Sequence, residues 1–145
     1  MPEVRKSVLV EFSPEQMFAL VDAVERYPEF LPWCGGSSVS YRDEHTTRAT
    51  IQINYRGIKQ SFTTENAKEP AHAMWVKLVQ GPFKTLDGDW RFIPLGDRGC
   101  KIEFRLHYEF SSRILEKLVG PVFNYIANTL VDAFVRRAES VYGPR

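Results

Sequence analysis

The sequence predicts an α+β fold in which a curled antiparallel sheet of about seven strands surrounds one long C-terminal helix. Two periodicities predict it. From Trp33 to Phe110 apolar and polar residues alternate with a period near two, and turn residues separate the runs. From Ile114 to Ala138 apolar residues recur every four positions, which is typical of an amphipathic helix. A further alternating run, Val4 to Phe12, precedes both and predicts a first strand.

Length and composition favour one domain over residues 1–145. The chain has 145 residues, 43% of them hydrophobic, and a net charge of +1. A chain this close to neutral is not a general polyanion binder, so no DNA partner is expected. Its two cysteines, Cys34 and Cys100, lack the spacing of a metal site. No apolar leader opens the chain, and the longest uncharged run, Leu118 to Val131, is too short to span a bilayer. We therefore expect a cytoplasmic protein without a transmembrane segment.

Two short helices are expected directly after the first strand. Ser13 is a good helix N-cap, Pro14 suits the first helical position, and Gln16 stands where a capping box needs it. A second helical piece lies between Pro28 and Pro32. The segment Tyr27–Cys34 that contains it has two interpretations, a rigid aromatic lid over a cavity or a structural crossover into the sheet.

The strands that follow are separated by turn signals. Arg56-Gly57 predicts a tight hairpin, and the alternation of the next run favours Met74 rather than Trp75 on the inner face. Gly88 stands between Asp87 and Asp89, where we expect a bulge or hairpin turn rather than a metal site.

The final helix is the one element long enough to cover the apolar face of the sheet. Gly120-Pro121 lies inside it and predicts a kink, because proline removes a backbone donor. A sheet that curls over a single helix often leaves a gap where an apolar ligand binds.

Two motifs carry a resemblance to a known family. One is Tyr27-Pro28-Glu29-Phe30-Leu31-Pro32-Trp33-Cys34, and the other runs from Gly81 to Leu95. With the ending Ala133 to Gly143, they resemble the RatA/coenzyme Q-binding branch of the START-like (polyketide cyclase-like) superfamily. The resemblance extends from about Val4 to Gly143.

The resemblance implies a helix-grip fold with an internal apolar cavity, and it leaves three functions open. The first is a non-enzymatic protein that binds ubiquinone or another lipophilic molecule and supports respiration. The second is a RatA-type toxin that binds the large ribosomal subunit and blocks subunit association. The third is a cyclase-like enzyme, which we do not expect because no acid–base pair or nucleophile motif stands out. No cofactor is required, although ubiquinone or a lipid is a candidate ligand, and transient contact with a membrane surface stays open.

Candidate site residues follow from these functions. The expected ligand site is lined by Phe30, Leu31, Trp33, Phe62, Phe83, Leu86, Trp90, Phe92, Phe104, Phe123, Ile126 and Leu130. A plain core role for these residues is the alternative. The cations expected on ribosomal RNA are Arg113, Lys117, Arg136 and Arg137, together with Arg145. For these, a solvated helix face is the alternative. No catalytic and no metal-binding residue is expected.

Overall fold

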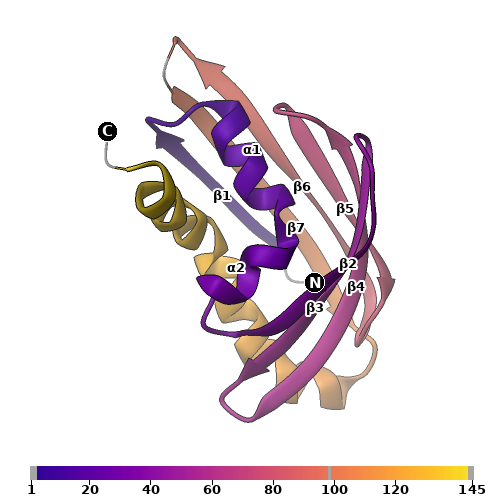
Figure 1. Cartoon of the computed structure of the whole chain (residues 1–145). Helices are drawn as coiled ribbons and strands as arrows, with labels where there is room; N and C mark the ends of the chain where they lie inside the picture. Colours follow the sequence, from indigo (N-terminus) through magenta and orange to yellow (C-terminus); the bar gives the residue numbers. More distant parts are fainter. Residues whose placement is uncertain (1–2, 98, 144–145) are drawn as a thin grey trace.

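The computed structural model describes residues 3–97 and 99–143 and confirms the expected fold class (Figure 1). The helices are α1 (Pro14–Asp22), the 3₁₀ helix η1 (Val24–Glu29) and α2 (Arg113–Tyr142). The strands are β1 (Glu3–Val10), β2 (Cys34–Arg42), β3 (Thr46–Tyr55), β4 (Ile58–Glu69), β5 (Ala73–Gln80), β6 (Phe83–Leu95) and β7 (Gly99–Phe110).

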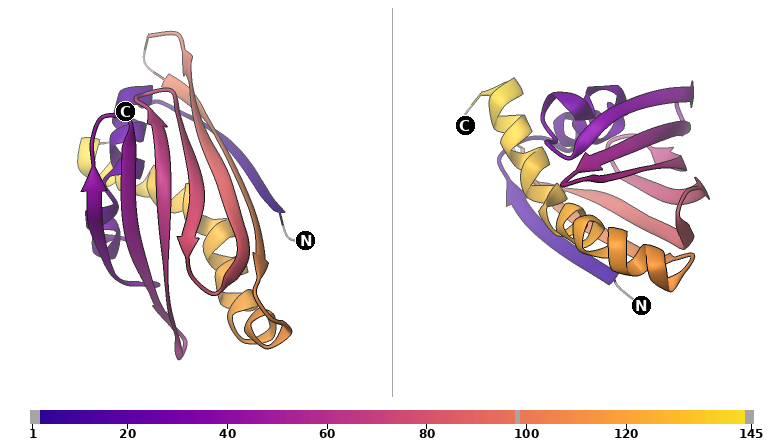
Figure 2. Two further views of the ribbon diagram at one scale, coloured as in Figure 1. Left: turned by 90° about the vertical axis from the view of Figure 1, so that its right-hand side faces the viewer. Right: turned by 90° about the horizontal axis from the view of Figure 1, so that it is seen from below.

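The seven strands form one antiparallel sheet in the order β1-β7-β6-β5-β4-β3-β2. Consecutive strands are neighbours except that β1 pairs with β7. The sheet curls, and α2 crosses its concave side (Figure 2). The helix packs mainly on α1 and on strands β1 and β7. These two strands are the first two at one edge of the sheet. The concave side of β3 to β5 is therefore less closely covered by α2.

The chain enters α1 through the expected capping box. The Ser13 hydroxyl accepts from the Gln16 backbone N–H at 3.1 Å, and the Gln16 side chain accepts from the Ser13 N–H at 2.9 Å. The hairpin at Arg56-Gly57 is also confirmed, with positive φ at both residues (51° and 82°) as a two-residue turn requires. Met74 points inward as predicted, since it is 1% exposed and Trp75 is 39% exposed.

Gly88 corrects one expectation, because it forms neither a bulge nor a turn. It lies inside β6 with unbroken pairing to Val76 on β5 and Leu106 on β7. A Cβ atom at this position would lie 2.4 Å from the Arg105 carbonyl oxygen. The glycine therefore permits a close approach of two backbones. The irregularity of β6 lies instead between Phe83 and Thr85, where the register with β7 shifts.

The first turns of α2 depart from the predicted apolar stripe. Ile114 and Leu118 are 70% and 59% exposed, whereas Val119 and Phe123 are buried. A four-residue repeat drifts around a helix of 3.6 residues per turn, so one straight stripe cannot stay buried over its whole length. The helix continues across Gly120-Pro121. Among the described residues α2 is the helix long and apolar enough to span a membrane by composition, and its buried face packs within the domain.

Candidate functional site

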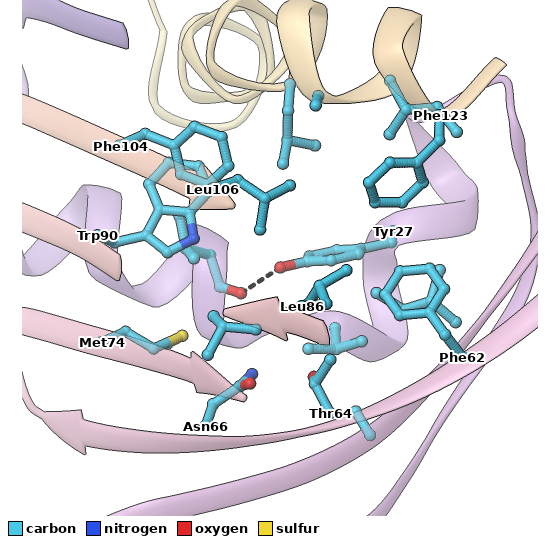
Figure 3. A pocket seen from close by; sticks show the side chains of 18 of the residues that line it. Tyr27, Phe62, Thr64, Asn66, Met74, Leu86, Trp90, Phe104, Leu106 and Phe123 are labelled. Carbon is cyan, nitrogen blue, oxygen red and sulfur yellow. Dashed lines mark hydrogen bonds between the residues drawn. The ribbon is translucent and has the colours of Figure 1, made fainter. Parts of the chain in front are cut away.

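An apolar cavity of about 90 Å³ lies between the curled sheet and α2 (Figure 3). Its wall is built from α1, η1, strands β3 to β7 and the middle of α2. The lining residues are Val21, Val24, Tyr27, Trp33, Ala49, Ile51, Phe62, Thr64, Asn66, Met74, Val76, Leu86, Trp90, Phe104, Leu106, Phe123, Ile126, Ala127 and Leu130. Sites for whole drug-sized ligands have roughly 300–1,000 Å³. At about 90 Å³ this cavity is several times smaller than such sites, so it holds at most a small head group and a long tail would lie outside it.

The structure brings eight of the twelve predicted ligand residues to this cavity. They are Trp33, Phe62, Leu86, Trp90, Phe104, Phe123, Ile126 and Leu130. The segment Tyr27–Cys34 contributes two residues to the wall, Tyr27 and Trp33. Within it the Tyr27 hydroxyl donates to the Val21 carbonyl at 2.5 Å, which ties the segment to the end of α1.

The other four predicted residues lie elsewhere, which corrects their placement. Phe92 packs edge-on against Phe18 of α1, with ring centroids 5.7 Å apart, because it stands one inward position beyond Trp90. The register shift after Phe83 turns its ring toward the ring of Phe110 in the core, with the two ring centroids 5.0 Å apart.

Phe30 and Leu31 are the remaining two of the four. They line a separate groove between η1 and α2. There the guanidinium of Arg137 lies 4.9 Å from the Phe30 ring centroid. The aromatic segment Tyr27–Cys34 therefore contributes side chains both to the cavity and to this groove.

Four lining residues are only partly buried, namely Ile51 on β3, Phe62 on β4, Val76 on β5 and Leu130 on α2. The rings of Tyr55 and Tyr125 stack at 5.7 Å and bridge β3 to α2 nearby. Because three of the four partly buried residues lie on β3, β4 and α2, we assign the mouth of the cavity to the space between these elements.

Besides Tyr27, three residues with polar side-chain groups lie in the cavity wall, namely Thr64, Asn66 and Trp90. Sequence reasoning missed two of them, Thr64 and Asn66. They occupy successive inward positions of β4, and each is at least nine-tenths buried. Among the described residues, the Asn66 side-chain oxygen is the buried polar side-chain atom that has no hydrogen-bond partner. Alternation from Phe62, a predicted ligand residue, places both on the same face of β4, but only apolar side chains were expected to contact the ligand.

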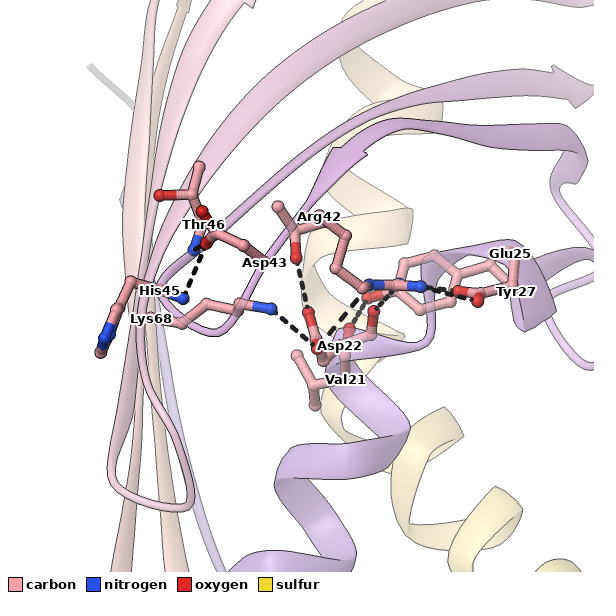
Figure 4. Close-up of polar contacts among 10 residues, drawn as sticks. Val21, Asp22, Glu25, Tyr27, Arg42, Asp43, His45, Thr46 and Lys68 are labelled. Carbon is pink, nitrogen blue, oxygen red and sulfur yellow. Dashed lines mark hydrogen bonds and ion pairs between the residues drawn. The ribbon is translucent and has the colours of Figure 1, made fainter.

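A polar cluster surrounds the C-terminal end of α1, next to the lining residue Val21 (Figure 4). Asp22, the last residue of α1, accepts from Thr47 at 2.9 Å and from the buried ammonium of Lys68 at 3.1 Å. Arg42 donates to the Asp22 carbonyl at 2.7 Å and to Glu25 at 2.8 Å. The hydrogen bonds from Arg42 lower the pKa of Glu25 to about 2. This cluster holds α1 and η1 against β2, β3 and β4.

The predicted ribosome-contacting cations fall into two groups. Arg113, Lys117 and Arg136 are exposed on α2. Arg137 instead pairs with Glu29 of η1 at 2.7 Å, and its side chain is 20% exposed. Arg145 lies outside the described residues. Arg137 is therefore engaged within the domain, while the first three are accessible to a partner.

Acid–base, nucleophilic and metal chemistry find little support in the described residues. Tyr27 is the one titratable side chain in the cavity wall, its hydroxyl is engaged, and burial raises its pKa. Burial also raises the pKa of Cys34, and it raises that of Cys100 to about 11. Both carboxylates beside Gly88 bind Arg105 at 3.0 Å. No group of three metal-ligating side chains occurs among these residues.

Comparison with known proteins places this geometry in context. The family described as "Polyketide cyclase / dehydrase and lipid transport" matches residues 10–135. The ribosome association toxin RatA of Vibrio cholerae is 48% identical over 143 residues, covering 99% of each chain. The mitochondrial coenzyme Q-binding protein COQ10 homolog B of Xenopus laevis is 30% identical over 97% of this chain and 59% of its own length. The Zhui aromatase/cyclase of Streptomyces sp. R1128 shares the fold, with a TM-score of 0.78 at 14% identity over 95% of this chain and 93% of its own.

Proposed function

The chain belongs to the polyketide cyclase/dehydrase and lipid transport family, in the branch that contains RatA, and from this membership we propose that it is a cytoplasmic ribosome-association protein of the RatA type. The observation that carries the proposal is the 48% identity to the V. cholerae toxin over 99% of both chains. The large ribosomal subunit is the proposed partner, and arrest of growth on overproduction is the proposed consequence.

The proposal assigns ribosomal RNA contacts to the exposed cations of α2. Arg113 and Lys117 occupy its first two turns, and Arg136 lies near its other end. Cations gain affinity for RNA by displacing counterions from phosphates. Arg137 is left out of the contact because Glu29 already pairs with it.

Cosedimentation with purified large subunits in a sucrose gradient tests this proposal. A triple charge reversal of Arg113, Lys117 and Arg136 to Glu is expected to abolish cosedimentation and growth arrest. The matched control reverses Lys59 and Lys77, which are exposed on β4 and β5. If the triple variant cosediments fully, these cations do not contact the ribosome. If the unchanged protein does not cosediment, the proposed ribosome-association function is wrong.

A second candidate function, binding of an apolar ligand such as ubiquinone, is favoured by the cavity itself. The cavity is largely apolar and opens beside α2. Burial of apolar groups supplies roughly 0.8 kcal/mol per methylene, so a tailed ligand needs no charged contact. The relative named as a coenzyme Q-binding protein makes a quinone the best candidate. Catalysis is not proposed, because the single titratable group of the wall is already engaged.

A variant that fills the cavity without unfolding the chain tests this second function. Ala127 lies on α2 against the cavity and is 1% exposed, and leucine retains helix propensity. Ala127→Leu is expected to weaken binding of decylubiquinone at least tenfold while the melting temperature stays equal or rises. Ala133→Leu, which lies outside the cavity wall on the same helix, is the control. Unchanged affinity in Ala127→Leu would place any binding elsewhere.

A further inference from the structure

We propose that the cavity selects a ligand with an uncharged, oxygen-bearing head, which hydrogen-bonds to Asn66, Thr64 and Trp90 while its apolar tail leaves through the mouth. This inference rests on the proposed ligand-binding function and specifies the chemistry of the ligand. It starts from one buried polar atom in the cavity wall that has no hydrogen-bond partner among the described residues.

The unpartnered atom belongs to the Asn66 amide. Asn66 is 6% exposed, and its side-chain oxygen is buried without a hydrogen-bond partner. Buried polar groups in folded proteins are nearly always hydrogen-bonded, so an unpartnered amide in a cavity wall marks a place where another molecule completes the bond. Figure 3 shows this amide pointing from β4 into the cavity, next to Thr64.

Thr64 and Trp90 supply two more polar groups to the cavity wall. Each is a lining residue and each is at most 5% exposed. The indole nitrogen of Trp90 points toward the cavity interior (Figure 3). Trp90 donates only, whereas the amide and the hydroxyl both donate and accept. A ligand carbonyl can accept from the Trp90 N–H, the Thr64 hydroxyl or the Asn66 amide N–H, and a ligand hydroxyl can in addition donate to the unpartnered Asn66 oxygen.

Strand pairing places these groups across one end of the cavity wall. Trp90 pairs with Met74, which pairs with Lys68, the next inward residue of β4 after Asn66. Trp90 and Asn66 are therefore separated by β5 and stand diagonally across it. A ring with oxygens on more than one edge would span this arrangement, and a single hydroxyl would reach only part of it.

The head should carry no net charge, because the cavity wall offers no counterion. Lys68 is the nearest cation along β4, but it is not a lining residue, and Asp22 already neutralises it at 3.1 Å. An ionised head would lose its hydration without gaining a partner. Fatty acids and phospholipids are therefore disfavoured. An oxidised quinone can accept from the donors of the wall, and the reduced form can also donate to the Asn66 oxygen.

The experiment compares three probes of similar tail length by calorimetric titration. They are decylubiquinone with a neutral oxygen-bearing head, decylbenzene without polar atoms, and dodecanoate with a charge. The unchanged protein is expected to bind decylubiquinone at least tenfold more tightly than either of the others. Asn66→Leu and Thr64→Val are each expected to lower the affinity for decylubiquinone threefold to tenfold, which corresponds to about one hydrogen bond. Neither substitution is expected to lower the affinity for decylbenzene.

Asn54→Leu, an equivalent substitution on the exposed face of β3, is the control and should change neither affinity. If the Asn66 and Thr64 variants change the affinities for decylubiquinone and decylbenzene equally, or change neither, the proposed head site is wrong and the ligand-binding function stands. Dodecanoate binding as tight as decylubiquinone would overturn the neutral head. If the unchanged protein binds none of the probes, the ligand-binding function itself fails.

Discussion

Asn66 places an amide where a globular core normally holds an apolar side chain. Its neighbours in the wall include Met74 and Val76. Leaving a buried amide unpaired costs roughly 1–3 kcal/mol. The ligand-free protein therefore sacrifices stability at the position that we assign to ligand recognition.

Replacing Asn66 by leucine is accordingly expected to stabilise the ligand-free protein. The substitution removes the unpaired amide and adds apolar volume beside a cavity, and both effects raise the free energy of unfolding, together by about 1 kcal/mol. Urea denaturation measures this change, and Asn54→Leu should stay within about 0.5 kcal/mol of the unchanged protein. A loss of stability in Asn66→Leu would mean that the amide supports the fold rather than a ligand.

Cys100 makes stability sensitive to alkaline pH. It is fully buried and lies on β7 between Val10 of β1 and Pro94 of β6. Burial raises its pKa to about 11. The unfolded chain releases this proton near pH 8.5, whereas the folded chain retains it up to about pH 11. Between these values the unfolded state binds fewer protons, so the free energy of unfolding falls as pH rises, by at most about 1.4 kcal/mol per pH unit for this group.

The comparison of the unchanged protein with Cys100→Ala isolates this contribution. The variant is expected to be less stable at neutral pH, because it leaves a small void, but to lose less stability between pH 8.5 and 10.5. Calorimetric melting temperatures across that range measure both slopes. Parallel slopes would assign the alkaline loss to the buried tyrosines, whose pKa values burial also raises.

At the scale of elements, η1 and α2 are joined by ring packing between Tyr27 and Phe134 and by an ion pair between residues far apart in sequence. Arg137 pairs with Glu29 at 2.7 Å and covers the ring of Phe30 at 4.9 Å. The ion pair is partly exposed, so its strength is modest, whereas the covered ring adds apolar contact. This contact holds the aromatic segment, whose other side forms part of the cavity wall.

A double-mutant cycle on Arg137 and Glu29 measures the free energy of interaction between these two side chains. Arg137→Met keeps the apolar stem over Phe30 and Glu29→Gln keeps the side-chain shape. The coupling free energy is expected to be about 0.5 kcal/mol, within the range for exposed pairs, and to shrink in high salt. Ribosome cosedimentation of Arg137→Met should stay normal. A selective loss of cosedimentation would instead return Arg137 to the RNA-contacting group.

The elements could be predicted from sequence where local chemistry decides them. Ser13 at a helix start and Arg56-Gly57 at a hairpin act within a few residues, and both were confirmed. Gly88 was predicted wrongly because the reason for a glycine there is the Arg105 carbonyl of another strand. Which aromatics line the cavity likewise depends on the bulge after Phe83 and on where α2 crosses the sheet. Asn66 was missed because only apolar side chains were expected in the ligand site, although alternation places it on the same face of β4 as Phe62.

At the scale of the whole molecule, the two proposed functions use different surfaces. The cavity lies under α2, whereas Arg113, Lys117 and Arg136 are exposed on that helix. Arg136 is about six helical turns from the other two, which is roughly 30 Å at the usual helix rise. A single phosphate cluster cannot satisfy both ends. A partner that contacts all three cations must therefore present phosphates along an extended surface, as an RNA helix does.

Salt dependence tests whether these three cations carry the association. Each phosphate that a cation neutralises contributes roughly 0.7–0.9 to the slope of log affinity against log salt. Three contacts predict a slope of about −2 to −3, and each single reversal among Arg113, Lys117 and Arg136 should reduce its magnitude by about one. Cosedimentation at a series of potassium chloride concentrations measures the slope. A slope near zero would shift the contact to the exposed apolar side chains of Ile114 and Leu118, since apolar burial does not release counterions.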